Sequence, residues 1–264
     1  MLPRSVLGSY TKGGPLLVGL YQGVHLCGKI DCMIEKQKPV AFFDIDGTVF
    51  RSSLLVELVE TLINEEIFPK SARREYLAEF DAWKNREASY EAYIAALITT
   101  FLKHIKGVHY GLFADVGKRV VALHSKRVYR YTRDLLAEVK SKGYVTVAIS
   151  QSPKTILDTF CTAYGFDKVY GRIYEIGPQD CFTGEITDEH LIENKANIVR
   201  RVFERYPELT KVGSVAVGDT DGDIPLLEIV DTAICFNPNQ ALFKHAKRVG
   251  WQVVVERKDV IYNI

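Results

Sequence analysis

Three short apolar runs without polar alternation occur along the chain, and each ends at a polar turn. The runs, each with the residues that end it, are 40–43 with Asp44, 144–149 with Ser150, and 213–217 with Gly218 and Asp219. Runs of this length are typical of strands buried on both faces, as in a parallel sheet. The pattern therefore predicts three central strands with polar residues at their carboxyl ends.

Helix signals follow the second and third of these strands. Ser152 and Pro153 predict the N-cap and first turn of one helix, and Asp223 with Pro225 predicts those of another. Strands that alternate with helices imply an α/β fold with a doubly wound, Rossmann-like parallel sheet. Two more apolar runs extend the predicted sheet: 232–236 and 252–255.

Between the first and second strands the apolar spacing becomes helical. Apolar residues recur at helical spacing over 54–62 and again over 90–105, where several are aromatic. An aromatic stripe at this spacing predicts helix–helix packing and not a cofactor site. We expect residues 33–55 and 133–264 to form an α/β core, and residues 56–132 to form a helical cap inserted between the first two strands.

The N-terminal segment lies outside this pattern. Arg4 and the apolar run 16–20 faintly resemble an export signal, but Gln22 and His25 interrupt the run and no cleavage pattern of small residues follows. We expect residues 1–32 to be a loosely ordered extension or an upstream mis-start of translation.

Length and composition exclude several classes of protein. The 264 residues are 47% hydrophobic and 25% charged, which suits a large buried core and argues against a disulfide-stapled or disordered chain. The 34 Lys and Arg residues nearly balance the 33 Asp and Glu residues, so the net charge is +1. This charge gives no reason to expect nucleic acid or an acidic membrane as a partner.

The cysteines and the apolar runs point to a compartment. The five cysteines are an odd number, are scattered, and form no CxxC pair or zinc-type spacing with histidine. We therefore expect reduced thiols and a cytoplasmic protein. No apolar run reaches the roughly 18 residues that a membrane-spanning helix needs, so we expect no membrane partner.

Polar residues at the strand ends are the candidates for chemistry, because ligands of an open parallel sheet bind beyond the carboxyl ends of its strands. Asp44, Asp46, Asp219 and Asp223 would converge there and repel one another. Each alone has an ordinary role as a turn or cap residue. Together they predict a site for a hard divalent cation, with Mg²⁺ as the first choice.

Two further residues suit a phosphoryl group beside such a cation. The Ser150 hydroxyl and the free backbone N–H groups after it can donate to phosphate oxygens. Lys195 lies between an expected turn at Thr183-Gly184 and an apolar helical pattern from Ile198 onward. On its own, Lys195 would be interpreted as a solvated surface lysine.

With these motifs in order, the chain resembles the haloacid dehalogenase-like superfamily of phosphohydrolases, in its phosphoserine-phosphatase-like branch. The four motifs are matched by 44–48, Ser150, Lys195 and 218–223. The resemblance covers about residues 38–264. It implies a Mg²⁺-dependent phosphatase that acts on a small phosphomonoester, with a helical cap over the active site.

The resemblance also implies the reacting groups. Asp44 is the expected nucleophile, which forms an aspartyl-phosphate, and Asp46 is the expected general acid and then base. Ser150, Gln151 and Lys195 are expected to bind the phosphoryl oxygens.

The metal ligands follow from the same resemblance. Mg²⁺ is expected to be held by Asp44, by the backbone carbonyl of Asp46 and by Asp219. Asp223 is expected to orient Lys195 or a metal-bound water.

Three positions depart from the pattern of phosphoserine phosphatases. Ser53 replaces the glutamate that binds the substrate ammonium group, Gln151 replaces a glycine, and Gly222 replaces an asparagine. The missing ammonium partner predicts a different small phosphorylated substrate. Arg51 could contact an acidic substrate, although a surface salt bridge is the commoner role of a lone arginine.

Two other functions share these motifs. A phosphotransferase would keep the first step and pass the phosphoryl group from Asp44 to an alcohol instead of water. A non-catalytic phosphate-binding module would keep the fold, but the complete motifs argue against it. The sequence leaves the physiological substrate and the oligomeric state open.

Overall fold

A computed structural model describes residues 37–264, and the predicted extension of residues 1–32 lies outside the described residues. The strands are β1 (Lys38–Asp44), β2 (Val145–Pro153), β3 (Lys168–Ile176), β4 (Phe182–Thr187), β5 (Leu209–Gly218), β6 (Thr232–Phe236), β7 (Gln252–Arg257) and β8 (Val260–Asn263). The α-helices are α1 (Leu54–Asn64), α2 (Leu77–Lys84), α3 (Tyr90–Ile105), α4 (Tyr110–His124), α5 (Arg130–Ser141), α6 (Lys154–Ala163), α7 (Glu189–Glu193), α8 (Lys195–Arg205), α9 (Ile224–Leu227) and α10 (Gln240–Val249). Short 3₁₀ turns are η1 (Lys70–Glu75), η2 (Pro178–Asp180) and η3 (Asp221–Asp223).

The strands form one sheet in the order β4-β3-β2-β1-β5-β6-β7-β8. Six neighbouring strands of this order pair in parallel, namely β3, β2, β1, β5, β6 and β7. Strand β1 lies between β2 and β5. This arrangement confirms the predicted doubly wound α/β fold. The outer strands β4 and β8 are antiparallel, which the apolar pattern did not predict because both are short and half-exposed.

The turn expected at Thr183-Gly184 was wrong, because both residues lie within β4. Gly184 has a φ of +93°, a conformation that glycine adopts without strain. The strand nevertheless continues to Thr187, which pairs with Ile173 of β3.

Both faces of the sheet are covered by helices. On one face, Ala41 and Phe43 of β1 pack in a buried cluster with side chains of α5 and α6. On the other face, Val40 and Phe42 pack with side chains of α8, α9 and α10. All four are fully buried, which explains why this strand shows no polar alternation.

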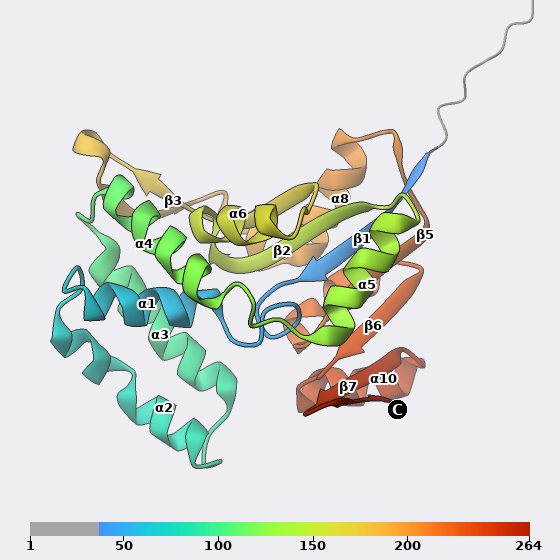
Figure 1. Ribbon diagram of the computed structural model, residues 1–264, viewed down its shortest axis with the longest axis horizontal. Helices are drawn as coiled ribbons and strands as arrows, with labels where there is room; N and C mark the ends of the chain where they lie inside the picture. The colour runs from blue at the N-terminus through green and yellow to red at the C-terminus, as the bar shows by residue number, and fades with distance from the viewer. Residues whose placement is uncertain (1–36) are drawn as a thin grey trace, which may run out of the picture. The chain divides into compact units, whose positions relative to one another are not determined.

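The helices between β1 and β2 include the region predicted as a cap. The two connections to this region lie side by side, since Phe50 and Val128 form an antiparallel bridge. Figure 1 shows α1, α2 and α3 grouped together beyond the carboxyl end of β1. We use "cap" for α1, η1, α2, α3 and α4. The expected cap boundaries at residues 56 and 132 stay a proposal, because neither coincides with the start of a helix. Helix α1 begins at Leu54, and α5, which packs on β2, begins at Arg130.

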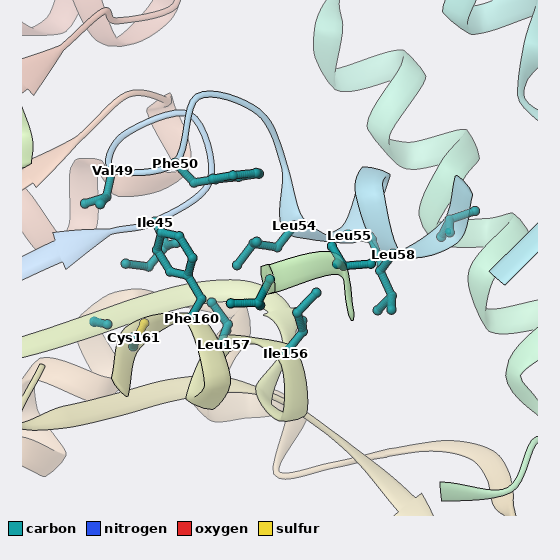
Figure 2. Packing of buried hydrophobic residues seen from close by; sticks show 14 of the residues in the cluster. Ile45, Val49, Phe50, Leu54, Leu55, Leu58, Ile156, Leu157, Phe160 and Cys161 are labelled. Atoms are coloured by element: carbon teal, nitrogen blue, oxygen red, sulfur yellow. The ribbon is translucent and has the colours of Figure 1, made fainter. Parts of the chain in front are cut away.

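The cap is joined to the core by apolar packing. Figure 2 shows Leu54 and Leu58 of α1 facing Ile156 and Leu157 of α6. Phe160, one turn further along α6, packs against the ring of Phe50 with centroids 5.5 Å apart. The first cap helix is therefore held against the sheet at the edge where β1 and β2 end.

The cysteines and the helices of the described residues bear on two further sequence expectations. Cys161, Cys181 and Cys235 are free thiols, as predicted for these three cysteines. Within residues 37–264, no helix combines the length and the apolar character that crossing a membrane requires.

Candidate active site

The residues predicted at the strand ends lie around one cavity of about 170 Å³. Asp44 ends β1, Ser150 and Gln151 lie in β2, and Asp219 directly follows β5. Because β1 lies between β2 and β5, the three strand ends are adjacent. Lys195, the first residue of α8, also lines the cavity.

Lys195 is buried and ion-paired, so the reading as a surface lysine does not hold. The residue is 6% exposed, and its Nζ lies 2.5 Å from Asp44 Oδ1 and also donates to Asp223 Oδ1. Burial works against the charge of Lys195, but Asp223 and Asp44 together raise its pKa. For Asp44, burial outweighs the attraction of Lys195 and raises the pKa to about 7.

Three of the four carboxylates that the sequence predicted to converge form a cluster, and Asp46 is not among them. Oxygens of Asp44, Asp219 and Asp223 lie within 4.8 Å of one another. Burial raises the pKa of Asp219 well above its ordinary value, and the charges of Asp44 and Asp223 add to this effect. Asp44 Oδ2 is buried without a hydrogen-bond partner among the described residues. Buried, mutually repelling oxygens of this kind fit a hard cation such as Mg²⁺.

Asp223 has less freedom to bind a cation. Its Oδ2 accepts the N–H groups of Asp219 and Thr220, each at 3.1 Å, while Oδ1 accepts from Lys195. Asp223 is the N-cap residue of α9, with Pro225 in the first turn as the sequence predicted, but its side chain makes no cap bond to that helix and instead fixes the loop after β5. Asp223 contacts Lys195, and its expected role in orienting Lys195 or a metal-bound water stays a prediction.

Asp46 lies outside this cluster, and its side chain is hydrogen-bonded to other groups. Its Oδ1 accepts the N–H of Leu54 at 2.5 Å, and its Oδ2 accepts the hydroxyls of Ser150 and of Ser152, the latter at 2.8 Å. Asp46 thus connects the end of β2 to the first residue of the cap. Ser150, predicted to bind phosphate, donates here to Asp46.

The prediction that Ser152 caps the following helix was wrong. The N-cap of α6 is Pro153, with no side-chain cap bond, because β2 continues to that residue. Ser152 lies two residues after Ser150 in an extended strand, so both side chains point to the same side. Its hydroxyl contacts Asp46, and its N–H donates to Ser150 Oγ at 2.9 Å.

Gln151 is held by an arginine that the sequence analysis did not find. Arg172 of β3 is 8% exposed and donates to Gln151 Oε1 at 3.1 Å, while its Nε has no partner among the described residues. Nothing near Arg172 in the sequence indicates this contact, because it depends on the pairing of β2 with β3.

Gly47 is required by the geometry of the site. Its φ is +82°, and a Cβ at this position would lie 2.1 Å from Asp219 Oδ2. A side chain would therefore both strain the backbone and displace a carboxylate of the cluster. The Asp-Gly pair does more here than form an ordinary turn.

The cap supplies the apolar wall of the cavity through Leu55 of α1 and a stripe of α3. Tyr90, Ile94 and Ile98, spaced four residues apart, face the cavity. The neighbouring stripe, which includes Tyr93 and Leu97, is buried in the core as the sequence predicted. The prediction that this stripe packs in the core was thus correct, but one edge of the stripe also lines the cavity.

Known proteins resemble this chain in sequence and in fold. A family model described as haloacid dehalogenase-like hydrolase matches residues 41–228. A curated phosphoserine phosphatase of Mycobacterium tuberculosis is 25% identical over 229 residues, covering 83% of this chain and 73% of the relative. A histidinol-phosphatase of Neisseria meningitidis is 30% identical over 125 residues, covering 46% of this chain and 56% of the relative. A solved protein of unknown function from Bordetella pertussis has a TM-score of 0.65 at 19% identity, covering 82% of this chain and 98% of its own.

These findings confirm two sequence predictions. The solved structure supports the α/β fold alone, since its sequence identity is low. The family model spans well over half of the chain and includes all four motifs. On that match, this chain belongs to the haloacid dehalogenase-like hydrolases.

Proposed function

We propose that this hydrolase is a Mg²⁺-dependent phosphatase that cleaves a small phosphomonoester through an aspartyl-phosphate on Asp44. One observation carries the proposal. The buried Asp44 carboxylate has one oxygen held by Lys195 and the other without a partner among the described residues, at the wall of a small cavity. The names of the phosphatase relatives support the same reaction class.

The chemistry divides into two displacements at phosphorus. A carboxylate oxygen of Asp44 bonds to phosphorus while the bond to the ester oxygen breaks, and Asp46 gives a proton to the leaving alkoxide. Asp46 then takes a proton from a water molecule that attacks the same phosphorus. The Asp44–phosphate bond breaks, inorganic phosphate leaves and the carboxylate is restored.

The remaining residues hold the phosphoryl group and offset its charge. Lys195, already ion-paired with Asp44, places a cation beside the transferred group. Ser150 can turn its hydroxyl from Asp46 to a phosphoryl oxygen, since Ser152 also donates to Asp46. Gln151, positioned by Arg172, adds a side-chain amide at the cavity wall.

Asp44, Asp219 and the backbone carbonyl of Asp46 would hold Mg²⁺. The ion would offset the charge that develops on the phosphoryl oxygens. Thr48 donates to Asp219 Oδ1 at 3.3 Å and so orients this carboxylate.

The cavity does not favour an ammonium group on the substrate. Its acidic residues are Asp44, Asp46 and Asp219, which the reaction itself uses. Ser53 also lines the cavity, but its side chain caps α1 by accepting from the N–H of Leu55. We therefore propose a substrate other than phosphoserine. A cytoplasmic location and the absence of a nucleic-acid partner stay predictions from the sequence.

A substrate screen tests the proposal. Purified full-length chain with Mg²⁺ is offered small phosphate esters, and both free phosphate and phosphorylated alcohol are measured with and without added alcohols. We expect free phosphate as the main product and no turnover by Asp44→Asn. Phosphorylated alcohol as the main product would favour a phosphotransferase, and no release from any ester would contradict the proposal.

A further inference from the structure

A second and larger pocket adjoins the catalytic cavity. This outer pocket has a volume of about 840 Å³ and lies between α2 and α3 of the cap and the strand β7 of the core. Tyr90 and Asp219 line both the outer pocket and the catalytic cavity. A molecule with its phosphate at Asp44 can therefore extend past these two residues.

The outer pocket is rich in cations without acidic partners. Arg51, Arg86 and Arg257 line it, and none of them forms an ion pair with a described carboxylate. Glu256, also in the wall, accepts the backbone N–H groups of Arg130 at 3.2 Å and of Tyr131 at 2.9 Å. Among the described residues, Arg51 therefore lacks the surface salt bridge considered for it. The three arginines of the pocket outnumber its two acidic residues, Asp219 and Glu256.

The same pocket offers aromatic surfaces. Trp83 is stacked on Tyr93 with ring centroids 5.5 Å apart and planes 11° apart, and it lies 5.2 Å from the ring of Tyr90. Tyr129 lies below the guanidinium of Arg51, 5.5 Å from the ring centroid. Rings in this arrangement favour a flat, unsaturated group over a chain of sp³ carbons.

We propose that the outer pocket binds the leaving group of a phosphate monoester that carries a flat ring and a second anionic group. The arginine guanidiniums pair with that distal anion, a carboxylate or a phosphate, because their planar donors match two oxygens at once. The aromatic side chains contact the ring. This inference rests on the proposed phosphatase function and adds the class of its substrate.

Pairs of esters that differ only in the distal anion test the inference. One pair is phenyl phosphate and 4-carboxyphenyl phosphate, and the other is a nucleoside 5′-monophosphate and its 3′,5′-bisphosphate. We expect a kcat/KM about tenfold or more higher for the doubly anionic member of at least one pair. The pair that shows the preference distinguishes a carboxylate from a phosphate as the distal group. Equal values within both pairs would overturn the inference.

Arginine variants assign the preference to this pocket. Arg51→Gln, Arg86→Gln and Arg257→Gln should each reduce the ratio between the two members of the preferred pair, mainly through KM. Arg74→Gln is the matched control, because Arg74 is an exposed cap arginine that lines neither the cavity nor the outer pocket. An unchanged ratio in all three pocket variants would contradict the assignment.

A binding measurement separates this inference from the proposed reaction. The chain has two tryptophans, so Trp251→Phe leaves Trp83 of the outer pocket as the fluorescent reporter. Benzylphosphonate and 4-carboxybenzylphosphonate, which cannot be hydrolysed, are titrated into this variant. We expect the carboxylated probe to change Trp83 fluorescence with a Kd about tenfold lower, and Arg86→Gln to remove the difference. If the carboxylated probe binds more tightly but no ester is hydrolysed, the proposed phosphatase reaction is refuted and the outer-pocket inference stands. If the two probes bind equally well, the proposed substrate class is refuted.

Discussion

Lys195 illustrates how a single side chain depends on its partners. It is buried between Asp44 and Asp223 and pairs with both carboxylates. Its single positive charge therefore lies among three clustered carboxylates, those of Asp44, Asp219 and Asp223. A buried ion pair adds little net stability, but a buried charge without a partner is costly. Removing a negative charge from this cluster should therefore leave the fold intact, whereas removing the positive charge of Lys195 should destabilise it.

Asp44→Asn should abolish phosphatase activity and leave the fold intact. The amide is a very poor nucleophile, so the first displacement cannot occur. Lys195 keeps its bond to Asp223, and the cluster loses one of its repelling charges. Phosphate release and the thermal midpoint by circular dichroism measure the two effects. Turnover like that of the unsubstituted enzyme would refute the role of Asp44.

Lys195→Met should lower the stability of the protein as well as its activity. It leaves Asp44 and Asp223 buried without a counter-ion, which should cost about 3–5 kcal/mol in the free energy of unfolding. Urea denaturation without divalent cations measures the loss. Lys244→Met, at an exposed position on α10, is the control and should change stability little. Equal stability of the two variants would show that Lys195 does not compensate the cluster.

Asp46→Asn should slow turnover in a way that depends on the leaving group. An amide cannot protonate the departing alkoxide, so esters of weakly acidic alcohols should lose most activity, and aryl esters with acidic leaving groups should lose less. Steady-state rates over a series of esters give this dependence. The same loss for every ester would mean that Asp46 acts through its hold on Leu54 at the start of the cap and not as an acid.

At the scale of elements, α1 and α3 decide what reaches the catalytic residues. Leu55, Tyr90, Ile94 and Ile98 make the cap side of the cavity apolar. The acidic residues of α1 are engaged elsewhere. Glu57 pairs with Arg127 at 2.8 Å, and Glu60 pairs with Arg73 at 2.6 Å.

Phosphoserine should therefore be a poor substrate. Its ammonium group would lose water on entering the cavity and would find neither a carboxylate at Ser53 nor a free one on α1. An uncompensated charge of this kind costs on the order of several kcal/mol, which corresponds to orders of magnitude in kcat/KM. Competition between phosphoserine and neutral or anionic esters measures it. A higher kcat/KM for phosphoserine would overturn this interpretation of the cap.

Local patterns explain which elements the sequence could predict. Val40 to Phe43 predicted β1 because a strand buried on both faces leaves an uninterrupted apolar run, and the residue after it predicted part of the site. Ser152 was misassigned because a serine before proline also fits a helix N-cap, and only the length of β2 decides between the two. Arg172 and the cavity-facing edge of α3 depend on contacts distant in sequence, which periodicity does not contain.

At the scale of the whole molecule, the order of the strands creates the site. The chain passes from β1 to β2 on one side and later returns from β4 to β5 on the other side of β1, so the carboxyl ends of β1, β2 and β5 meet beside one crevice. Asp44 and Asp219 come from strands far apart in the sequence, and folding brings their charges together. The folded state therefore pays an electrostatic cost that the unfolded chain does not have.

Mg²⁺ should relieve this cost and stabilise the folded chain. An ion that binds the folded state and not the unfolded one raises stability in proportion to RT ln(1 + [Mg²⁺]/Kd), so the thermal midpoint should rise by several degrees at saturation. Ca²⁺ should also raise the midpoint but inhibit turnover, because it takes more oxygen ligands and could occupy both oxygens of Asp44. Asp219→Asn should lose the shift, since it removes a carboxylate that Thr48 orients and for which Gly47 leaves room. Melting curves with and without each ion, together with phosphate release after exhaustive chelation, measure both effects. Full activity after chelation, with a midpoint that Mg²⁺ leaves unchanged, would show that these carboxylates serve another purpose.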